Sequence, residues 1–168
     1  MPATRCSDHG LDAVRIDNRF GSALIYRLGA HVAAWQPAGH DPVLWMSTRS
    51  HFAVGKPIRG GVPVCFPWFG AHPSAATLPA HGFARVLQWD IATLRDEADG
   101  TTTAVFALSD SAQTRLWWPH AFGLTLTVNV GAALDIQLDL AAPRVARLDV
   151  FPVNPVVPRP AMKQQITV

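Results

Sequence analysis

Two short segments in the middle of the chain hold side chains that could bind an anion. Arg59 precedes a pair of glycines, and Arg85 follows His81 by four residues. Glycine lets a backbone bend or approach a ligand closely, and a guanidinium presents a planar fork of donors that suits a carboxylate or phosphate. His81 could donate or accept a hydrogen bond near neutral pH. The alternative is that both arginines are ordinary surface or ion-pair residues and that His81 is a satisfied core or turn histidine.

Aromatic residues are interleaved with these segments. Trp68, Phe69 and Phe83 could stack on the apolar face of a sugar ring, although plain core packing explains each of them equally well. Cys65 reads as a buried apolar thiol, because no base stands beside it. The histidines and the two cysteines lack metal-ligand spacing, and no G-x-G-x-x-G, P-loop or G-x-S-x-G motif occurs. We therefore expect neither a metal nor a cofactor.

The composition favours one globular domain. The chain has 168 residues, of which 49% are hydrophobic and 15% charged, with a formal net charge of +2. No dense basic run suggests a nucleic-acid partner. No apolar run reaches the roughly 18 residues of a membrane span, and no signal peptide is visible, so we expect a cytoplasmic protein without a membrane partner. Glu97 is the only glutamate among 12 acidic residues, which limits the supply of catalytic bases.

Alternating apolar and polar residues predict antiparallel strands that bury one face. Gly and Pro interrupt the chain too often for long helices, and Asp99-Gly100 is a strong hairpin signal. The strands are predicted at Ala23–Leu28, His31–Gln36, Val43–Met46, Leu87–Leu94, Thr102–Leu108, Phe122–Val130 and Ala133–Leu140.

The end of the chain differs in character from the rest. Five prolines fall between Pro143 and Pro160, and proline is confined to the edges of sheets because it cannot donate to a ladder. We therefore divide the chain into a β-rich part, residues 1–142, and an irregular Pro-rich tail, residues 143–168.

A known family is similar to this chain in the same segments. Arg59–Gly70 (RGGVPVCFPWFG), followed by Leu78–Arg85 (LPAHGFAR), resembles the glucose-6-phosphate 1-epimerases, or D-hexose-6-phosphate mutarotases. These belong to the aldose 1-epimerase, galactose mutarotase-like superfamily. Leu28–Ser47 and Trp117–Val130 add supporting similarity, and the resemblance runs from about residue 22 to residue 140.

The resemblance implies a fold and a function. The fold would be an antiparallel β-sandwich with an open cleft for a hexose 6-phosphate. The activity would be an isomerase that interconverts the α and β anomers of glucose 6-phosphate without a cofactor or metal. Arg59 and Arg85 match the family's substrate-binding arginines, and His81 matches the histidine that lines the sugar site.

The sequence departs from the family near Ala141. The family's general-acid histidine, in an H-T-Y-F-like strand, an aspartate that holds the sugar and a late general-base glutamate would all follow that point, and none has a counterpart here. The chain looks like the N-terminal part of the fold. We therefore expect poor catalysis from it and assign no catalytic residue. Two alternatives stay open: a non-catalytic sugar-phosphate-binding module or truncated remnant, and a β-sandwich interaction domain without a sugar site.

Loss of the later strands would also leave an exposed sheet edge. We expect this edge near Leu134–Leu140, where unpaired backbone groups would invite self-association with another chain.

Overall fold

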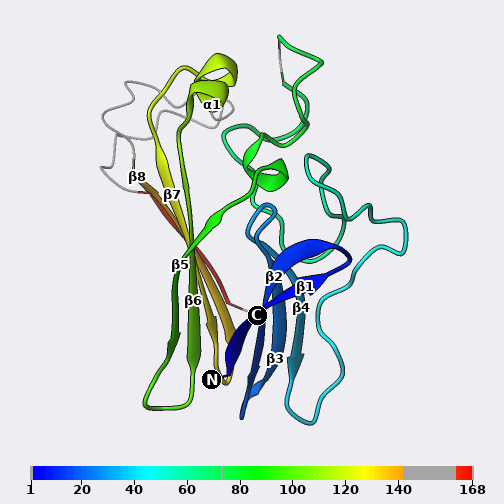
Figure 1. Ribbon diagram of the computed structural model, residues 1–168, viewed down its shortest axis with the longest axis vertical. Coiled ribbons are helices and arrows are strands. Elements are labelled where there is room, and N and C mark those ends of the chain that lie inside the picture. The colour runs from blue at the N-terminus through cyan, green and yellow to red at the C-terminus, as the bar shows by residue number, and fades with distance from the viewer. Residues whose placement is uncertain (1, 73, 142–161, 168) are drawn as a thin grey trace.

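The computed structural model describes residues 2–72, 74–141 and 162–167, and these residues form two antiparallel sheets (Figure 1). The first sheet has the order β1 (Ala3–Asp8), β2 (Leu11–Asn18), β3 (Gly21–Tyr26), β4 (His31–Pro37). The second has the order β5 (Asp90–Asp96), β6 (Thr102–Ser109), β7 (Gly123–Val130), β8 (Leu134–Ala141), β9 (Met162–Thr167). The expected antiparallel β-sandwich is confirmed.

The apolar faces of both sheets meet in one core. Strand β7 alternates as its sequence predicts, because Leu124, Leu126 and Val128 are at most 2% exposed while the residues between them are half-buried. Val14 and Ile16 of β2 are 0% exposed and belong to the same cluster. Burying a side chain of this size stabilises the fold by about 1.5–3 kcal/mol, so this core holds the two sheets together.

Strands β1 and β2 were not predicted from the sequence. They form a hairpin through His9 and Gly10, which both have positive φ, 49° and 78°. Strand β2 lacks a simple alternation because Ala13 and Val14 are adjacent and both buried. Val14 faces the main core, whereas Ala13 packs in a second cluster with Tyr26. A strand that buries residues on both faces does not show a period of two.

Two predicted strands differ from the structure. Val43–Met46 forms no strand and makes only an isolated bridge from Met46 to Gly60. The predicted strand Leu87–Leu94 is divided between the two sheets. Its first part pairs with the β3–β4 turn, where Gly29 N–H donates to the Leu87 carbonyl at 2.7 Å, and its second part is β5. The chain crosses from the first sheet to the second within this segment. A single stretch of alternating apolar and polar residues therefore contributes to both sheets.

The expectations for the end of the chain need correction. Strand β8 pairs with β9 in an antiparallel register from Asp135↔Thr167 to Leu140↔Met162. The exposed edge expected at Leu134–Leu140 is therefore wrong for the described residues, and self-association through it loses its structural basis. Residues 162–167 are extended rather than irregular, and residues 142–161 of the predicted tail lie outside the described part.

A short helix, α1 (Ala112–Trp117), was also not predicted. Its N-cap Ser111 accepts from the Thr114 N–H, and the Thr114 side chain accepts from the Ser111 N–H, which is a capping box. The helix ends at Trp117-Trp118, where both rings pack on buried phenylalanines. No helix in the described residues is long and apolar enough to cross a membrane.

Candidate functional site

The long connection between β4 and β5 carries every predicted site residue (Figure 1, cyan to green). Backbone hydrogen bonds hold the Arg59 segment of this connection to the Trp45–Ser47 segment and to β4. The Ser47 N–H donates to the Arg59 carbonyl at 3.1 Å, and the Gly61 N–H donates to the Trp45 carbonyl at 2.8 Å. The Val62 N–H then donates to the Val32 carbonyl of β4 at 2.9 Å, so the segment is docked on the first sheet.

The two glycines after Arg59 are required by close backbone contacts. A Cβ atom on Gly60 would lie 2.5 Å from the Trp45 carbonyl oxygen. A Cβ atom on Gly61 would lie 2.3 Å from the Val32 carbonyl oxygen and 2.9 Å from Nε2 of His31. Arg59 itself is exposed, and its side chain makes no hydrogen bond or ion pair with the described residues. Its guanidinium is therefore available to a ligand.

His81 is held in a tight turn against Gly70. It has a φ of 64°, its backbone N–H donates to the Gly70 carbonyl at 2.7 Å, and its Nδ1 accepts from the Gly70 N–H at 3.1 Å. Because Nδ1 is an acceptor, the proton of the neutral imidazole is on Nε2. The Phe69 ring packs edge-on with its centroid 4.5 Å away. His81 is a turn histidine that keeps one free donor.

Arg85 lies in the 3-10 helix η1 (Ala84–Val86) and is half-buried. Its Nε is buried and has no hydrogen-bond partner in the described residues. The β3–β4 turn packs on its backbone so closely that a Cβ on Gly29 would lie 3.0 Å from the Cα of Arg85. Burial, together with the nearby Arg85 charge, lowers the pKa of His31 to about 4. Burial raises the pKa of Cys65, and Arg85 opposes that shift.

The structure brings two of the three candidate segments to the β3–β4 turn and the start of β4. Arg85 packs against Gly29, and Gly61 of the Arg59 segment packs against His31, while an isolated bridge between Phe66 and Gly82 anchors the His81 segment. In the described part of the chain, no hydrogen bond joins the side chains of Arg59, His81 and Arg85 to one another.

The three candidate aromatic residues have different surroundings. Phe83 is 0% exposed and packs against the rings of Phe66 and Phe122, so it is core and does not meet a sugar. Trp68 is half-buried, and its Nε1–H donates to the Pro79 carbonyl at 3.1 Å. Phe69 is 59% exposed beside His81, so it remains a candidate platform.

One exposed aromatic residue at the site was missed from the sequence. Trp45 is 72% exposed and adjoins the Arg59 segment through its carbonyl contact with Gly61. Sequence reasoning placed Trp45 in a strand, where it would count as core, so only the loop conformation shows its exposure.

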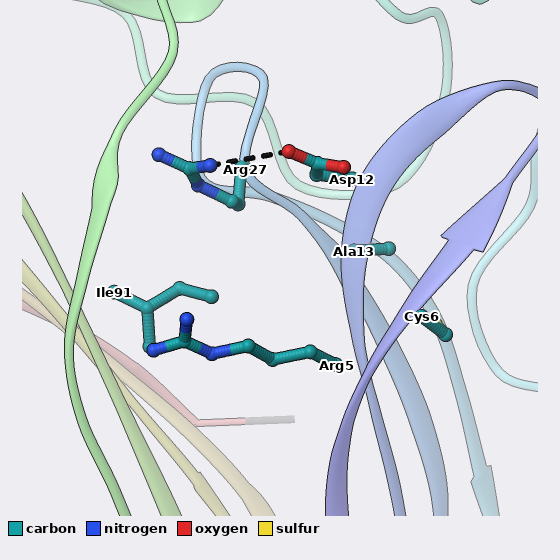
Figure 2. Close-up of a pocket in the computed structure, with 6 residues that line it drawn as sticks. All are labelled: Arg5, Cys6, Asp12, Ala13, Arg27 and Ile91. Atoms are coloured by element: carbon teal, nitrogen blue, oxygen red, sulfur yellow. Dashed lines mark hydrogen bonds and ion pairs between the residues drawn. The ribbon is translucent and has the colours of Figure 1, made fainter.

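A pocket elsewhere contains none of the predicted residues. It has a volume of about 150 Å³ and is lined by Arg5, Cys6, Asp12, Ala13, Arg27 and Ile91 (Figure 2). The guanidinium of Arg27 is occupied, because it donates to the Trp89 carbonyl at 2.9 Å, to Asp12 at 3.1 Å and to Asp90 at 3.3 Å. These hydrogen bonds link strands of the two sheets, and they leave the Arg27 guanidinium with few free donors for an anion.

The described residues contain no cluster of histidine, cysteine, aspartate or glutamate side chains that could hold a metal ion. His31 is 2% exposed, so its side chain is shielded from a dissolved ligand. Asp139, a conceivable base on β8, accepts instead from the Gln137 side chain at 2.7 Å. His81 is half-buried, and its Nε2–H makes no hydrogen bond within the described residues.

Comparison with known proteins identifies relatives of this chain. A protein of Escherichia coli (strain K12), named provisionally as a glucose-6-phosphate 1-epimerase, is 44% identical over 130 residues, which are 77% of this chain and 43% of that protein. A provisionally named glucose-6-phosphate 1-epimerase of Salmonella typhimurium is 41% identical over the same length.

A solved structure of a Salmonella typhimurium protein, provisionally named a mutarotase, superposes with a TM-score of 0.77 at 37% identity. The alignment covers 82% of this chain and 46% of that one. The chain therefore spans less than half the length of the relatives it matches. The aldose 1-epimerase family matches residues 12–155. The chain belongs to the aldose 1-epimerase family.

Proposed function

We propose that this chain forms the hexose-6-phosphate-binding part of a mutarotase site. The observation that carries the proposal is the state of Arg85. A half-buried guanidinium is normally paired with a carboxylate, because removing its charge from water is costly. Among the arginines of the described residues, Arg27, Arg95 and Arg115 form ion pairs and Arg85 does not. An anionic ligand such as a phosphate would supply the missing charge.

The three candidate residues would share the substrate between them. Arg59 and Arg85 would hold the phosphate through charge-assisted hydrogen bonds. His81 would donate its Nε2–H to a hydroxyl of the sugar, with the exposed Phe69 ring beside it. The names of the relatives support glucose 6-phosphate as the substrate.

The reaction we propose for the whole site is exchange of the α and β anomers. It requires a base that removes the proton of the C1 hydroxyl and an acid that protonates the ring oxygen, after which the two roles reverse. Each positioned group contributes roughly 10²–10⁴-fold. His81 is one candidate, and the second histidine and late glutamate that the resemblance implies have no counterpart in these 168 residues. We therefore expect this chain by itself to bind the sugar phosphate and to catalyse poorly.

The alternative is a non-catalytic sugar-phosphate-binding module. The observation that favours it is the burial of His31, which keeps this histidine from acting on a dissolved sugar. Binding alone does not raise turnover when ground and transition states are held equally. Binding and turnover must therefore be measured separately.

Titration calorimetry with glucose and with glucose 6-phosphate tests the binding proposal. We expect glucose 6-phosphate to bind the wild-type chain more tightly. A hydrogen bond to a charged group contributes about 1.5–3 kcal/mol, so Arg85→Gln and Arg59→Ala should each weaken glucose 6-phosphate roughly 10- to 100-fold while leaving glucose little changed. Arg15→Ala, which removes an exposed arginine of β2, is the matched control. Equal affinity of the wild-type chain for both sugars would contradict a phosphate site.

A further inference from the structure

Two buried polar atoms near the β3–β4 turn lack partners of complementary kind. Nε2 of His31 and Nε of Arg85 are both buried without a hydrogen bond in the described residues. The arginine Nε–H can only donate, whereas one nitrogen of a neutral imidazole accepts. Leaving a buried donor or acceptor unpaired destabilises the fold. The His31 nitrogen can therefore supply the acceptor that the Arg85 Nε–H lacks, and the Arg85 Nε–H can supply the donor that the His31 nitrogen lacks.

The backbone brings these two side chains into one neighbourhood. Gly29 packs directly on Arg85, with its Cβ position 3.0 Å from the Arg85 Cα, and His31 begins β4 two residues later. Nε2 of His31 also lies near Gly61, whose Cβ position is 2.9 Å away. His31 therefore lies between the segment of Arg59 and the segment of Arg85.

The electrostatics keep His31 neutral. Burial and the Arg85 charge both lower its pKa, to about 4, and a hydrogen bond with the Gly60 backbone opposes them. In the neutral tautomer that carries its proton on Nδ1, Nε2 has a free lone pair, and it has no hydrogen-bond partner in the described residues.

We propose that His31 is a positioning residue for Arg85. Its Nε2 accepts the Nε–H of Arg85 through one bridging water molecule and so fixes the plane of the guanidinium. The two terminal nitrogens of Arg85 then stay free for the ligand phosphate. This inference rests on the proposed function for its purpose, but the His31–Arg85 contact is testable without any ligand.

Nitrogen NMR of the ¹⁵N-labelled chain tests the contact directly. In the wild-type chain, the imidazole shifts at pH 7 should show His31 protonated on Nδ1 and not on Nε2. The Arg85 Nε–H should give a slowly exchanging signal, assigned by its loss in Arg85→Gln. His31→Gln keeps an acceptor near the Nε2 position and should preserve that signal. His31→Leu removes the acceptor and should speed its exchange at least 10-fold.

Two results would overturn the proposal. One is a wild-type His31 protonated on Nε2, which needs no variant and decides the matter even if His31→Leu fails to fold. The other is an Arg85 Nε–H that exchanges equally slowly in folded His31→Leu.

Ligand binding then separates this inference from the proposed function. The ratio of glucose 6-phosphate to glucose affinity should fall about 10-fold in His31→Leu and be kept in His31→Gln. A merely structural role would weaken both sugars together in His31→Leu and would contradict positioning. If the wild-type chain shows no preference for glucose 6-phosphate, the proposed function fails, while the NMR result still decides whether His31 holds Arg85.

Discussion

A Cβ atom on Gly82 would lie 1.9 Å from the carbonyl oxygen of Phe66. The two backbones run parallel at this point and form an isolated bridge, and the Ala84 N–H donates to the same Phe66 carbonyl at 3.2 Å. Gly82 also has a φ of 78°. Gly82 therefore allows the tight turn that connects His81 of the candidate site to Phe83 of the aromatic core.

Replacing this glycine should unfold the site and destabilise the chain. We expect Gly82→Ala to lower the free energy of unfolding by about 3 kcal/mol or more, because left-handed strain adds to a clash with backbone. Urea unfolding measures the effect. Gly10→Ala is the matched control, since Gly10 has the same φ of 78° and nothing within 4 Å of its Cβ position. It should cost only about 1–2 kcal/mol, and equal costs for the two variants would contradict the role of the Phe66 contact.

The buried His31 should make stability depend on pH. Its pKa is about 4 in the folded chain and about 6.5 when unfolded. The unfolded chain therefore binds more protons between these values, and stability falls as the pH drops through that window. We expect this residue to remove about 2 kcal/mol between pH 7 and pH 4.5.

The variant His31→Gln isolates this contribution, because glutamine does not titrate. Its unfolding free energy, measured in urea at several pH values, should fall less steeply below pH 6.5 than that of the wild-type chain. Parallel pH profiles for the two proteins would show that His31 is not a buried neutral base.

The cap of helix α1 should also contribute measurably. Ser111 bonds reciprocally with Thr114, which is 1% exposed. Ser111→Ala should lower the free energy of unfolding by about 1 kcal/mol, as measured by thermal or urea denaturation. Ser111→Asp should retain most of the stability because a carboxylate can cap the same N–H. An alanine variant as stable as the wild-type chain would mean that the tertiary contacts of Trp117 and Trp118 hold this turn without the cap.

The strands that could be predicted from the sequence are those with one apolar face and one polar face. The β7–β8 hairpin alternates over its whole length, so its register follows from the pattern. The β1–β2 hairpin was missed because β2 buries neighbouring residues on opposite faces. Leu87–Trp89 looked continuous with β5 because no local signal marks the point where a chain changes sheets.

The candidate site was only partly predictable. The glycines after Arg59 indicate a close backbone approach, and the structure shows which carbonyl groups require them. The burial of His31 and the exposure of Trp45 could not be read from their neighbours in the sequence, because both depend on how a 52-residue connection folds over β4, from residue 38 to residue 89. The same dependence made Phe83 a candidate sugar contact when it is a core residue.

Anomer exchange by this chain should be close to the spontaneous rate. The reaction needs an acid and a base in opposed positions, and losing either one removes roughly 10²–10⁴-fold. His81 supplies one such group through its free Nε2–H, while His31 is buried and Asp139 is engaged by Gln137. Exchange NMR on glucose 6-phosphate should therefore give rates for the wild-type chain and for His81→Ala that match buffer, with Arg15→Ala as a control for surface charge. A wild-type rate well above buffer that disappears in His81→Ala would show that the chain has a second catalytic group of its own.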